Sequence, residues 1–315
     1  MVSIDVVIPV YNGWELTRTC LQHLAAQSRE HRVIVADNGS TDGTQERVRT
    51  EFPAAGIVAL GTNAGFAVAC NAGARAGTGE IVVLLNNDVE CPPTFLERLV
   101  EPLASDDGVG SAAALLASPD GTIESFGVTV DPVLAGYPRL RGRPLEDADA
   151  ARPLLVGPSG AAGAYRRPAW DEVGGLDEGV FAYGEDVDLA LRLRAAGWSA
   201  AAAPAAVAVH LGSATAVVRS PRQRFQGGFS RGYFMRRYGV LHGRRMPRAL
   251  ATEAIAVAGD ALLYSHDLAA LRGRVAGWRV AASRPRNPRP PDDAIDRSIT
   301  FLESLRLRRN VYRCT

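Results

Sequence analysis

Three carboxylates lie within four positions of this chain, at Glu185, Asp186 and Asp188, directly after Gly184. Acidic residues in the first turn of a helix are stabilised by its unpaired amides, so a purely structural role is open. The apolar residues that follow recur at helical spacing until Gly197, which predicts a helix beginning at the acids. Such a helix can hold one carboxylate toward a cleft, where it can accept a proton from a hydroxyl group.

The segments that must position this helix alternate between two patterns. Short apolar runs typical of buried strands occupy residues 5–10, 32–37, 57–60 and 80–86, and segments with helical periodicity occupy residues 14–27, 44–52 and 65–76. This alternation predicts an α/β fold with a mainly parallel sheet flanked by helices on both faces.

Polar residues follow each of the four predicted strands. They occupy positions 11–12, 37–43, 62–65 and 86–88. A turn is a sufficient explanation for any one of these segments, because Asn, Asp, Gly and Ser are the usual turn formers. Since ligands of open α/β sheets bind at the carboxyl ends of the strands, the four segments together predict a binding site.

Five linked motifs, at residues 8–12, 36–44, 63–66, 85–88 and 183–188, together resemble those of the family 2 glycosyltransferases, and most closely the rhamnosyltransferase-like branch. The resemblance covers roughly residues 3 to 215. It implies a GT-A fold, a nucleotide-diphospho-sugar donor, a divalent metal and transfer with inversion at the anomeric carbon. The donor it implies is a dTDP- or UDP-sugar, with dTDP-rhamnose as the nearest analogy.

A metal site is expected around Asp88. The diphosphate leaving group of such a donor gathers negative charge as its bond to the sugar breaks, and a cation held by hard oxygen ligands stabilises that charge. The family commonly carries two acids here, but in this chain the first of the two positions is occupied by Asn86. By resemblance His210 completes the metal shell, although a histidine at a strand end also often has only a structural role. Imidazole suits Mn²⁺ better than Mg²⁺, and both metals stay open.

The resemblance assigns the general base to Asp186, with Glu185 shaping the acceptor side or the helix start. One carboxylate suffices for inverting transfer, because it takes the proton of the acceptor hydroxyl as the oxygen attacks. Asp188 lies about 200° further around a helix of 3.6 residues per turn, so we expect it to face elsewhere.

Donor recognition is expected at the first strand ends. Asp37 can accept the imide proton of uracil or thymine, although a guanine edge can also be bound by an acid. The other residues expected to contact the donor are Pro9, Val10, Tyr11, Asn12, Asn63, Gly65, Asn71, Asn87 and Asp88. Gly65 and Gly73 would let the backbone approach the ligand.

The chain between residues 115 and 155 lacks clean periodicity, which predicts a long loop. Such loops are often lids or acceptor contacts, and disorder explains residues 139–151 equally well. The small residues of the next segment, 157–166, are expected under the sugar or the acceptor.

The near-neutral net charge of +1 hides a strong asymmetry. Residues 1–218 hold 15 Arg against 27 acids, whereas residues 219–315 hold 20 Arg against 7 acids. We therefore divide the chain into a catalytic domain at 1–218, with a donor part to about 116 and an acceptor part from 117, and a basic helical extension at 219–315. Helices are predicted at 222–238, 247–282 and 292–308, and the proline-rich residues 283–291 form a stiff linker.

An anionic partner is expected for this extension, either a phospholipid surface, the phosphate of a lipid-linked acceptor or a second subunit in a homodimer. The acceptor itself is expected to be a carbohydrate, a lipid-linked sugar or a secondary metabolite. Nucleic acid is not expected, because no recognition motif accompanies the charge. We also expect the extension to pack on the catalytic domain or on the second subunit.

Composition sets the outer bounds of the prediction. With 315 residues and 47% hydrophobic content, the chain can bury one large core. Its four cysteines have no metal-ligand spacing, and no signal peptide or spanning apolar run is recognised. These features predict a cytoplasmic protein, with peripheral contact at the inner membrane face left open.

Two alternative functions remain. Sugar nucleotidyltransferases of similar fold carry an early glycine-rich loop and a functional lysine. This chain lacks that loop and has no lysine at all. A non-catalytic nucleotide-sugar-binding protein of the same fold is favoured by Asn86 and disfavoured by Asp88, Asp186 and His210. Metal-dependent release of a nucleoside diphosphate distinguishes these functions.

Overall fold

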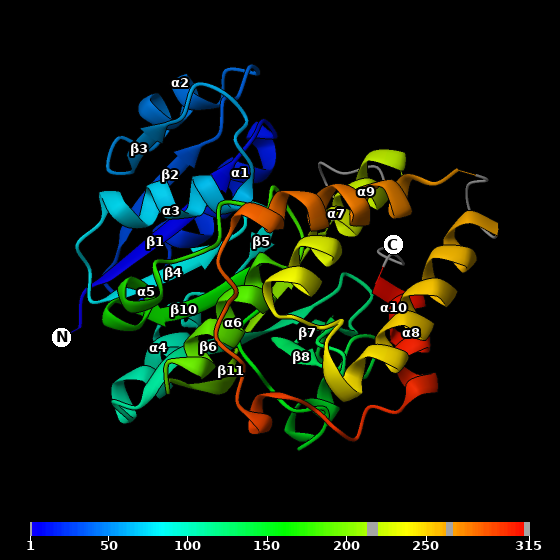
Figure 1. Cartoon of the computed structure of the whole chain (residues 1–315). Helices are drawn as coiled ribbons and strands as arrows, with labels where there is room; N and C mark the ends of the chain where they lie inside the picture. The colour runs from blue at the N-terminus through cyan, green and yellow to red at the C-terminus, as the bar shows by residue number, and fades with distance from the viewer. Residues whose placement is uncertain (1, 213–219, 263–266, 312–315) are drawn as a thin grey trace.

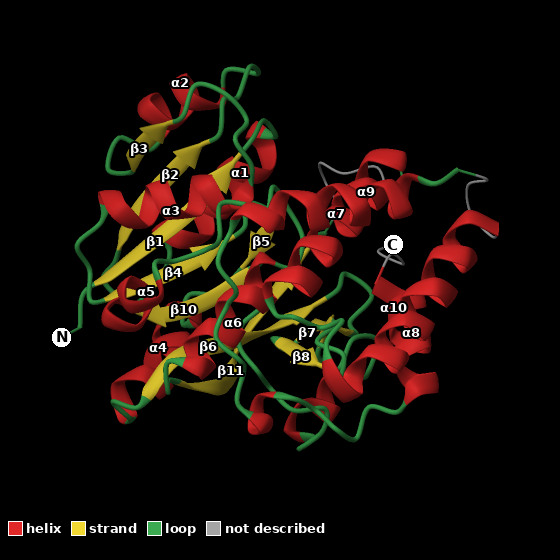
Figure 2. Ribbon diagram, in the orientation of Figure 1, coloured by secondary structure: helices red, strands yellow, loops and turns green. Residues whose placement is uncertain are grey.

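A computed structural model describes residues 2–212, 220–262 and 267–311, with the side chains of 309–311 left out. Its main element is one mixed sheet with the strand order β3-β2-β1-β4-β10-β6-β11-β5, and β7 pairs with β6 at the side (Figure 1). Helices lie on both faces of this sheet (Figure 2). The fold is therefore α/β, as the alternation predicts.

The first part of the chain forms parallel strands joined by helices. Its elements are β1 (Ile4–Val10), α1 (Trp14–Ala25), β2 (Arg32–Asp37), α2 (Thr44–Glu51), β3 (Gly56–Ala59), α3 (Phe66–Ala76) and β4 (Ile81–Leu85). The strand β1 pairs in parallel with both β2 and β4. Their carboxyl ends consequently meet at one edge, as Val10 opposite Asp37 illustrates.

Alternation along β1 explains why both faces of the sheet are covered. Val6 and Ile8 pack in a core cluster with Leu21 and Leu24 of α1, whereas Val7 packs in a second cluster with residues of α3. Successive side chains of a strand point to opposite faces, so a run of apolar residues needs a helix on each side.

The second part of the sheet brings the acidic helix to the same edge. Its elements are β5 (Val89–Glu90), α4 (Phe95–Ser105), β6 (Val109–Ala117), β10 (Ala162–Arg166), α5 (Arg167–Val173), α6 (Glu185–Ala195) and β11 (Ser199–His210). The strand β10 runs antiparallel between β4 and β6, with Ala162 opposite Leu85. The residues before β10 therefore lie beside the end of β4.

The prediction of a long loop at residues 115–155 is wrong. This segment contains β7 (Ile123–Ser125), β8 (Val128–Val130), β9 (Gly136–Pro138) and the short 3₁₀ helix η1 (Leu145–Asp149). The strands β8 and β9 form a hairpin. Asp131 holds its turn, because one carboxylate oxygen accepts hydrogen bonds from the amides of Val133 and Ala135. Buried residues such as Phe126 and Leu140 give the segment its own core.

The extension forms more and shorter helices than the sequence predicts. Its elements are α7 (Pro221–Arg237), η2 (Gly243–Arg245), α8 (Met246–Asp260), α9 (Ala269–Val280), η4 (Ala281–Ser283), η5 (Asp292–Ala294) and α10 (Phe301–Val311). The single helix predicted at 247–282 is wrong, since α8 and α9 are separate. The helix predicted at 292–308 is observed as two elements, the short η5 and α10, which begins at Phe301. Between them the chain is not helical, and Ile295 and Ile299 are buried there.

The extension packs on the rest of the chain. One core cluster joins Val130 and Val187 to Phe234 and Met235 of α7, and to Ile295. The amide of Asp296 also donates to the carbonyl of Val130 at 2.8 Å. The expected packing of the tail against the catalytic part is thus observed, while the domain boundary at 218 stays a prediction.

Candidate active site

A cavity of about 1180 Å³ lies at the edge where β4 ends and α6 begins. Asp88 and Asp186 both line it, together with Glu185, His210 and Asn86. The residues to which the resemblance assigns the metal and the general base therefore line one cavity. Ligand pockets of about 300–1,000 Å³ hold a drug-sized molecule, so this cavity has room for more than one small substrate.

The acidic helix begins as predicted. Gly184 has the left-handed φ of 83° and directly precedes Glu185, the first residue of α6. Asp186 accepts a hydrogen bond from the amide of Gly160 at 3.0 Å and another from the amide of Val187 at 2.8 Å. These contacts fix the Asp186 carboxylate at the cavity wall.

The two adjacent acids share a low-polarity environment. Burial, followed by the charge of Asp186, raises the pKa of Glu185 to about 8. Burial also raises the pKa of Asp186, although hydrogen bonds from the Gly160 and Val187 amides oppose the shift. One Glu185 oxygen is buried without a hydrogen-bond partner among the described residues. A raised pKa makes a carboxylate a stronger base.

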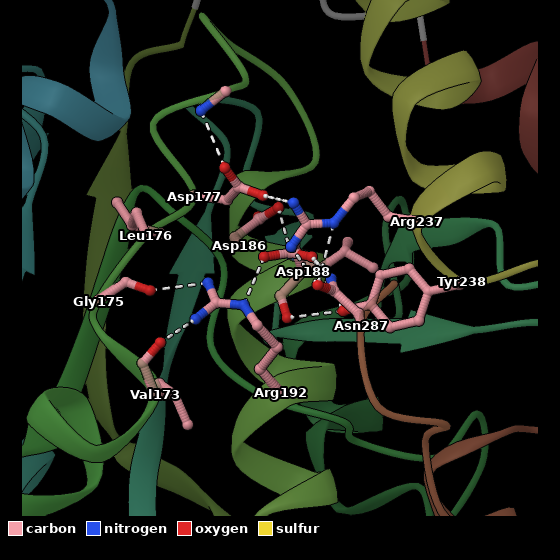
Figure 3. Close-up of polar contacts among 12 residues, drawn as sticks. Val173, Gly175, Leu176, Asp177, Asp186, Asp188, Arg192, Arg237, Tyr238 and Asn287 are labelled. Carbon is pink, nitrogen blue, oxygen red and sulfur yellow. Dashed lines mark hydrogen bonds and ion pairs between the residues drawn. The ribbon is translucent and has the colours of Figure 1, made fainter. Parts of the chain in front are cut away.

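Asp188 is held by a separate polar network (Figure 3). Its carboxylate accepts hydrogen bonds from Arg192 at 2.7 Å, from Asn287 at 2.7 Å and from the Tyr238 hydroxyl at 2.9 Å. Although Asp188 contributes to the cavity wall, its oxygens are occupied by these donors. Asp188 thus lines the same cavity as Asp186, but its carboxylate is directed at Arg192, Tyr238 and Asn287.

Asp88 and His210 meet at the end of the sheet. The His210 Nε2 atom lies 3.1 Å from Asp88 Oδ1, and its Nδ1 atom lies 3.6 Å from a Glu124 oxygen. Burial by itself lowers the pKa of His210, but hydrogen bonds and charge interactions with the two carboxylates outweigh it and raise the pKa to about 10. The imidazole is therefore protonated in the absence of a metal.

This donor set fits a divalent cation. Asp88 Oδ1 and His210 Nδ1 are both buried, and apart from the His210 contacts with Asp88 and Glu124 neither atom has a hydrogen-bond partner in the described part of the chain. No group of three or more His, Cys, Asp or Glu ligands assembles among the described residues. Mg²⁺-type sites are commonly completed by substrate phosphates and water, so few protein ligands suffice.

The expected donor residues lie near the strand ends but do not line the cavity, apart from Asp88. Pro9 and Val10 end β1, and Tyr11 is exposed beyond them. The Asn12 side chain accepts a hydrogen bond from the Thr41 amide at 2.8 Å. Asp37 is buried and retains one oxygen without a hydrogen-bond partner among the described residues, which suits a carboxylate that awaits a ligand.

Other expected donor residues have partners within the protein. Asn71 exchanges hydrogen bonds with both backbone groups of Leu176, and Asn87 donates to Thr17. Asn63 accepts a hydrogen bond from the Asn38 side chain at 3.0 Å. A Cβ at Gly65 would lie 2.7 Å from the Phe181 carbonyl oxygen, and one at Gly73 would lie 2.3 Å from Val7, so packing explains both glycines.

Sequence reasoning missed several residues of the cavity. Glu124 lies on β7, inside the segment predicted as a loop, and it forms an ion pair with Arg141. Burial raises the pKa of Glu124, but the hydrogen bond from His210 and the charge of Arg141 lower it overall. The extension adds Arg231, Arg274 and Arg308 to the wall. Only the excess of arginine in the extension signalled these three residues.

The family model described as "Glycosyl transferase family 2" matches residues 5–174, which is more than half of the chain. The chain belongs to glycosyl transferase family 2. A family 2 relative, N-acetylglucosaminyl-diphospho-decaprenol L-rhamnosyltransferase of Mycobacterium tuberculosis, is 30% identical over 234 residues. This match covers 66% of the chain and 75% of the relative. A second, the O-antigen biosynthesis protein RfbC of Myxococcus xanthus, is 30% identical over 62% of the chain and 16% of its own length.

Solved structures place this family 2 chain in the GT-A fold. The mannosyltransferase PcManGT from Pyrobaculum calidifontis, in complex with GDP-Man and Mn²⁺, matches with a TM-score of 0.53 and 22% identity, over 90% of this chain and 76% of that one. GalNAc-T7 with UDP, GalNAc and Mn²⁺ matches with a TM-score of 0.60 and 14% identity, over 88% of this chain and 54% of that one. The predicted glycosyltransferase family, its rhamnosyltransferase-like character and its fold are thereby confirmed.

Proposed function

We propose that this glycosyltransferase moves a sugar, with inversion, from a dTDP- or UDP-sugar such as dTDP-rhamnose to a hydroxyl group of a lipid-linked acceptor. The observation that carries the proposal is that Asp88 and Asp186 line one cavity. The rhamnosyltransferase relative, whose name specifies a diphospho-decaprenol acceptor, supports both the sugar and the lipid.

In the proposed reaction Asp186 is the general base. The acceptor oxygen attacks the anomeric carbon as the bond from that carbon to the diphosphate oxygen breaks, and the acceptor proton passes to Asp186. The Gly160 amide bond holds the carboxylate in place, while the raised pKa of Asp186 favours proton uptake. Glu185 shapes the acceptor side, and its pKa of about 8 keeps it largely uncharged at neutral pH.

Asp88 and His210 would hold a divalent cation, Mn²⁺ or Mg²⁺. When bound, the cation supplies Lewis-acid stabilisation of the departing diphosphate. Asp37 would accept the imide hydrogen of the donor base, since one of its buried oxygens lacks a hydrogen-bond partner among the described residues. Both solved relatives were captured with Mn²⁺, which supports the choice of metal.

The proposal extends to contact with a membrane surface. No helix in the described residues is long and apolar enough to cross a bilayer. Exposed apolar side chains gather on the extension, among them Leu250, Leu262, Leu271 and Leu302. Beside an arginine excess, such residues favour peripheral binding to anionic lipid at the inner membrane face. A cytoplasmic location and a homodimer stay predictions.

Release of nucleoside diphosphate tests the proposal. The protein is incubated with dTDP-, UDP-, GDP- and ADP-sugars and a short-chain lipid-linked acceptor, with Mn²⁺ or with EDTA. We expect metal-dependent release from a dTDP- or UDP-sugar that depends on the acceptor. Release from none of the donors would favour the non-catalytic alternative and overturn the proposal.

A further inference from the structure

The C-terminal helices form a strongly basic part of the cavity wall, which we call the arginine wall. It consists of Arg231, Arg274 and Arg308, which surround Glu253, and of Arg306. Arg231 comes from α7, Glu253 from α8, Arg274 from α9, and Arg306 and Arg308 from α10. Figure 1 shows these four helices grouped beside the sheet domain. Residues distant in sequence thus converge on one site.

Three arginines share the single carboxylate. Arg231 and Arg274 donate from Nε to different oxygens of Glu253 at 2.7 and 2.8 Å, and Arg308 lies at 2.5 Å. Burial alone raises the pKa of Glu253, but the three arginines outweigh it, so the carboxylate is charged. Asp131 is a second acid close enough for its charge to act on Arg308. Arg231, Arg274 and Arg308 together outnumber Glu253 and Asp131, so this cluster carries a net positive charge.

Hydrogen-bonding capacity remains on the wall. Arg274 donates from Nε to Glu253 and from Nη1 to the Ala270 carbonyl, which leaves its Nη2 without a hydrogen-bond partner among the described residues. Arg306 is exposed and forms no ion pair within the described part of the chain. By contrast, Arg224 in the same cavity is neutralised by Asp260 and Asp267. Partly buried guanidinium groups with unused donors are costly unless an anion satisfies them.

The surroundings identify the kind of anion. Leu134, Phe234, Ile255 and Leu305 line the same cavity, so apolar surface accompanies the arginines. Guanidinium groups bind phosphate through paired hydrogen bonds, and apolar side chains accommodate a hydrocarbon chain. Because the cavity is continuous with Asp186, an acceptor with its hydroxyl at Asp186 can extend to the wall.

We propose that the arginine wall binds the diphosphate of a prenyl-diphosphate-linked acceptor, with the first isoprene units against the adjacent apolar residues. The inference rests on the proposed function, because it takes the acceptor to react at Asp186. It assigns acceptor selection to the extension and donor binding to the strand ends.

Binding in the presence of EDTA tests the proposal without turnover. Farnesyl diphosphate, farnesol and inorganic pyrophosphate are titrated calorimetrically into the wild type, Arg274→Gln and Arg306→Gln. Arg272→Gln is the matched control, because Arg272 is exposed on the same helix and does not line the cavity. Arg274→Gln leaves Glu253 paired with Arg231 and Arg308, so the fold is expected to persist.

We expect farnesyl diphosphate to bind most tightly and each wall variant to weaken it by about tenfold, with Arg272→Gln unchanged. Equal affinity for pyrophosphate would overturn the lipid part of the proposal. Unchanged binding in both wall variants, or no binding to the wild type, would overturn the diphosphate site.

A second titration separates this inference from the proposed function. Binding of dTDP or UDP with Mn²⁺ is measured in the same variants and in Asp88→Asn. Loss of nucleotide binding only in Asp88→Asn, together with unchanged farnesyl diphosphate binding in that variant, supports two distinct sites. If farnesyl diphosphate binding is lost in Asp88→Asn as well, the prenyl diphosphate occupies the donor site and the inference is wrong.

Discussion

The Tyr238 hydroxyl lies 2.9 Å from Asp188 Oδ1, so the residue that follows α7 is bonded to the helix that presents Asp186. Asn287 donates to the same Asp188 oxygen at 2.7 Å (Figure 3). The proline-rich linker and α7 therefore both contact α6 through one carboxylate. The extension helps to position the acidic helix.

Tyr238→Phe is expected to lower the free energy of unfolding by about 1.5–3 kcal/mol, because it removes a buried hydrogen bond to a charged group. Urea denaturation monitored by circular dichroism measures the change. Tyr11→Phe is the control, since Tyr11 is 43% exposed and its hydroxyl loss should leave stability unchanged. Equal stability of Tyr238→Phe and wild type would contradict the structural role.

Asp186→Asn is expected to reduce turnover by about 10²–10⁴-fold, because the amide cannot accept the acceptor proton. Donor binding should be unchanged. Asp188→Asn should lose less turnover but more stability, since its ion pair with the buried Arg192 is broken. Initial rates with the same donor and acceptor, measured on folded protein, compare the two. Equal losses of turnover would refute the assignment of the base.

Asp88→Asn is expected to abolish the effect of Mn²⁺ on nucleoside diphosphate binding, because an amide is a weaker ligand than a carboxylate. Titration of UDP or dTDP with Mn²⁺ and with EDTA measures this effect. Asp107→Asn serves as the control, because Asp107 is a fully exposed acid outside the cavity. Persistence of a full Mn²⁺ effect in Asp88→Asn would place the metal elsewhere.

The raised pKa of Glu185 predicts that stability falls as pH increases. The folded protein retains the Glu185 proton up to about pH 8, whereas an unfolded chain releases it near the ordinary glutamate pKa of 4.5. The contribution of Glu185 to the free energy of unfolding is therefore fully present below about pH 4.5. It is lost as the pH rises toward 8, because the unfolded chain releases this proton more easily than the folded protein does. Denaturation in the absence of ligands from pH 5 to 8 measures the slope. Glu185→Gln should flatten it, and an unchanged slope would exclude Glu185 as its source.

Gly65→Ala is expected to destabilise the fold by about 1–3 kcal/mol through backbone strain and a further contact penalty. Gly65 has a φ of 101°, and an added Cβ would lie 2.7 Å from the Phe181 carbonyl oxygen. Gly61→Ala isolates the strain, since Gly61 has a φ of 75° and open space around it. Thermal unfolding should show the larger loss for Gly65→Ala. Equal losses would mean that the contact with Phe181 adds nothing.

Local patterns predict the catalytic half of the structure well. The apolar runs that become β1, β2 and β4 are long enough to show buried strands, and Gly184 with its acids marks the start of α6. The parallel-strand rule places Asp88 at the carboxyl edge of the sheet, but Asp186 begins a helix after the antiparallel strand β10. Its place in the same cavity could be expected only from the resemblance to the glycosyltransferase motifs.

The errors have identifiable physical reasons. The strands β7, β8 and β9 have three residues each, which is too short for a period of two to stand out. The helix predicted at 247–282 ignored Asp267, whose carboxylate accepts the Ala269 amide hydrogen at the start of α9. At the start of α10 the Thr300 hydroxyl likewise accepts a hydrogen bond from the Glu303 amide.

Glu124 could not have been predicted from local patterns. Its position beside His210 depends on the pairing of β7 with β6 and of β6 with β11. The same limit applies to the arginine wall, because four separate helices bring its members together. Contacts of this kind arise from tertiary packing alone.

The antiparallel strand β10 also limits how the enzyme can change over evolution. Because β10 pairs with β4 on one side and β6 on the other, inserting one residue within it would exchange the inward and outward sides of Ala164 and Tyr165. The resulting shift in register would also break the hydrogen bonds of Gly160 to Asp186 and of Asn86 to Ala161. Insertions and deletions among homologous proteins should therefore occur in surface turns, while the number of residues between Gly160 and Arg166 stays constant.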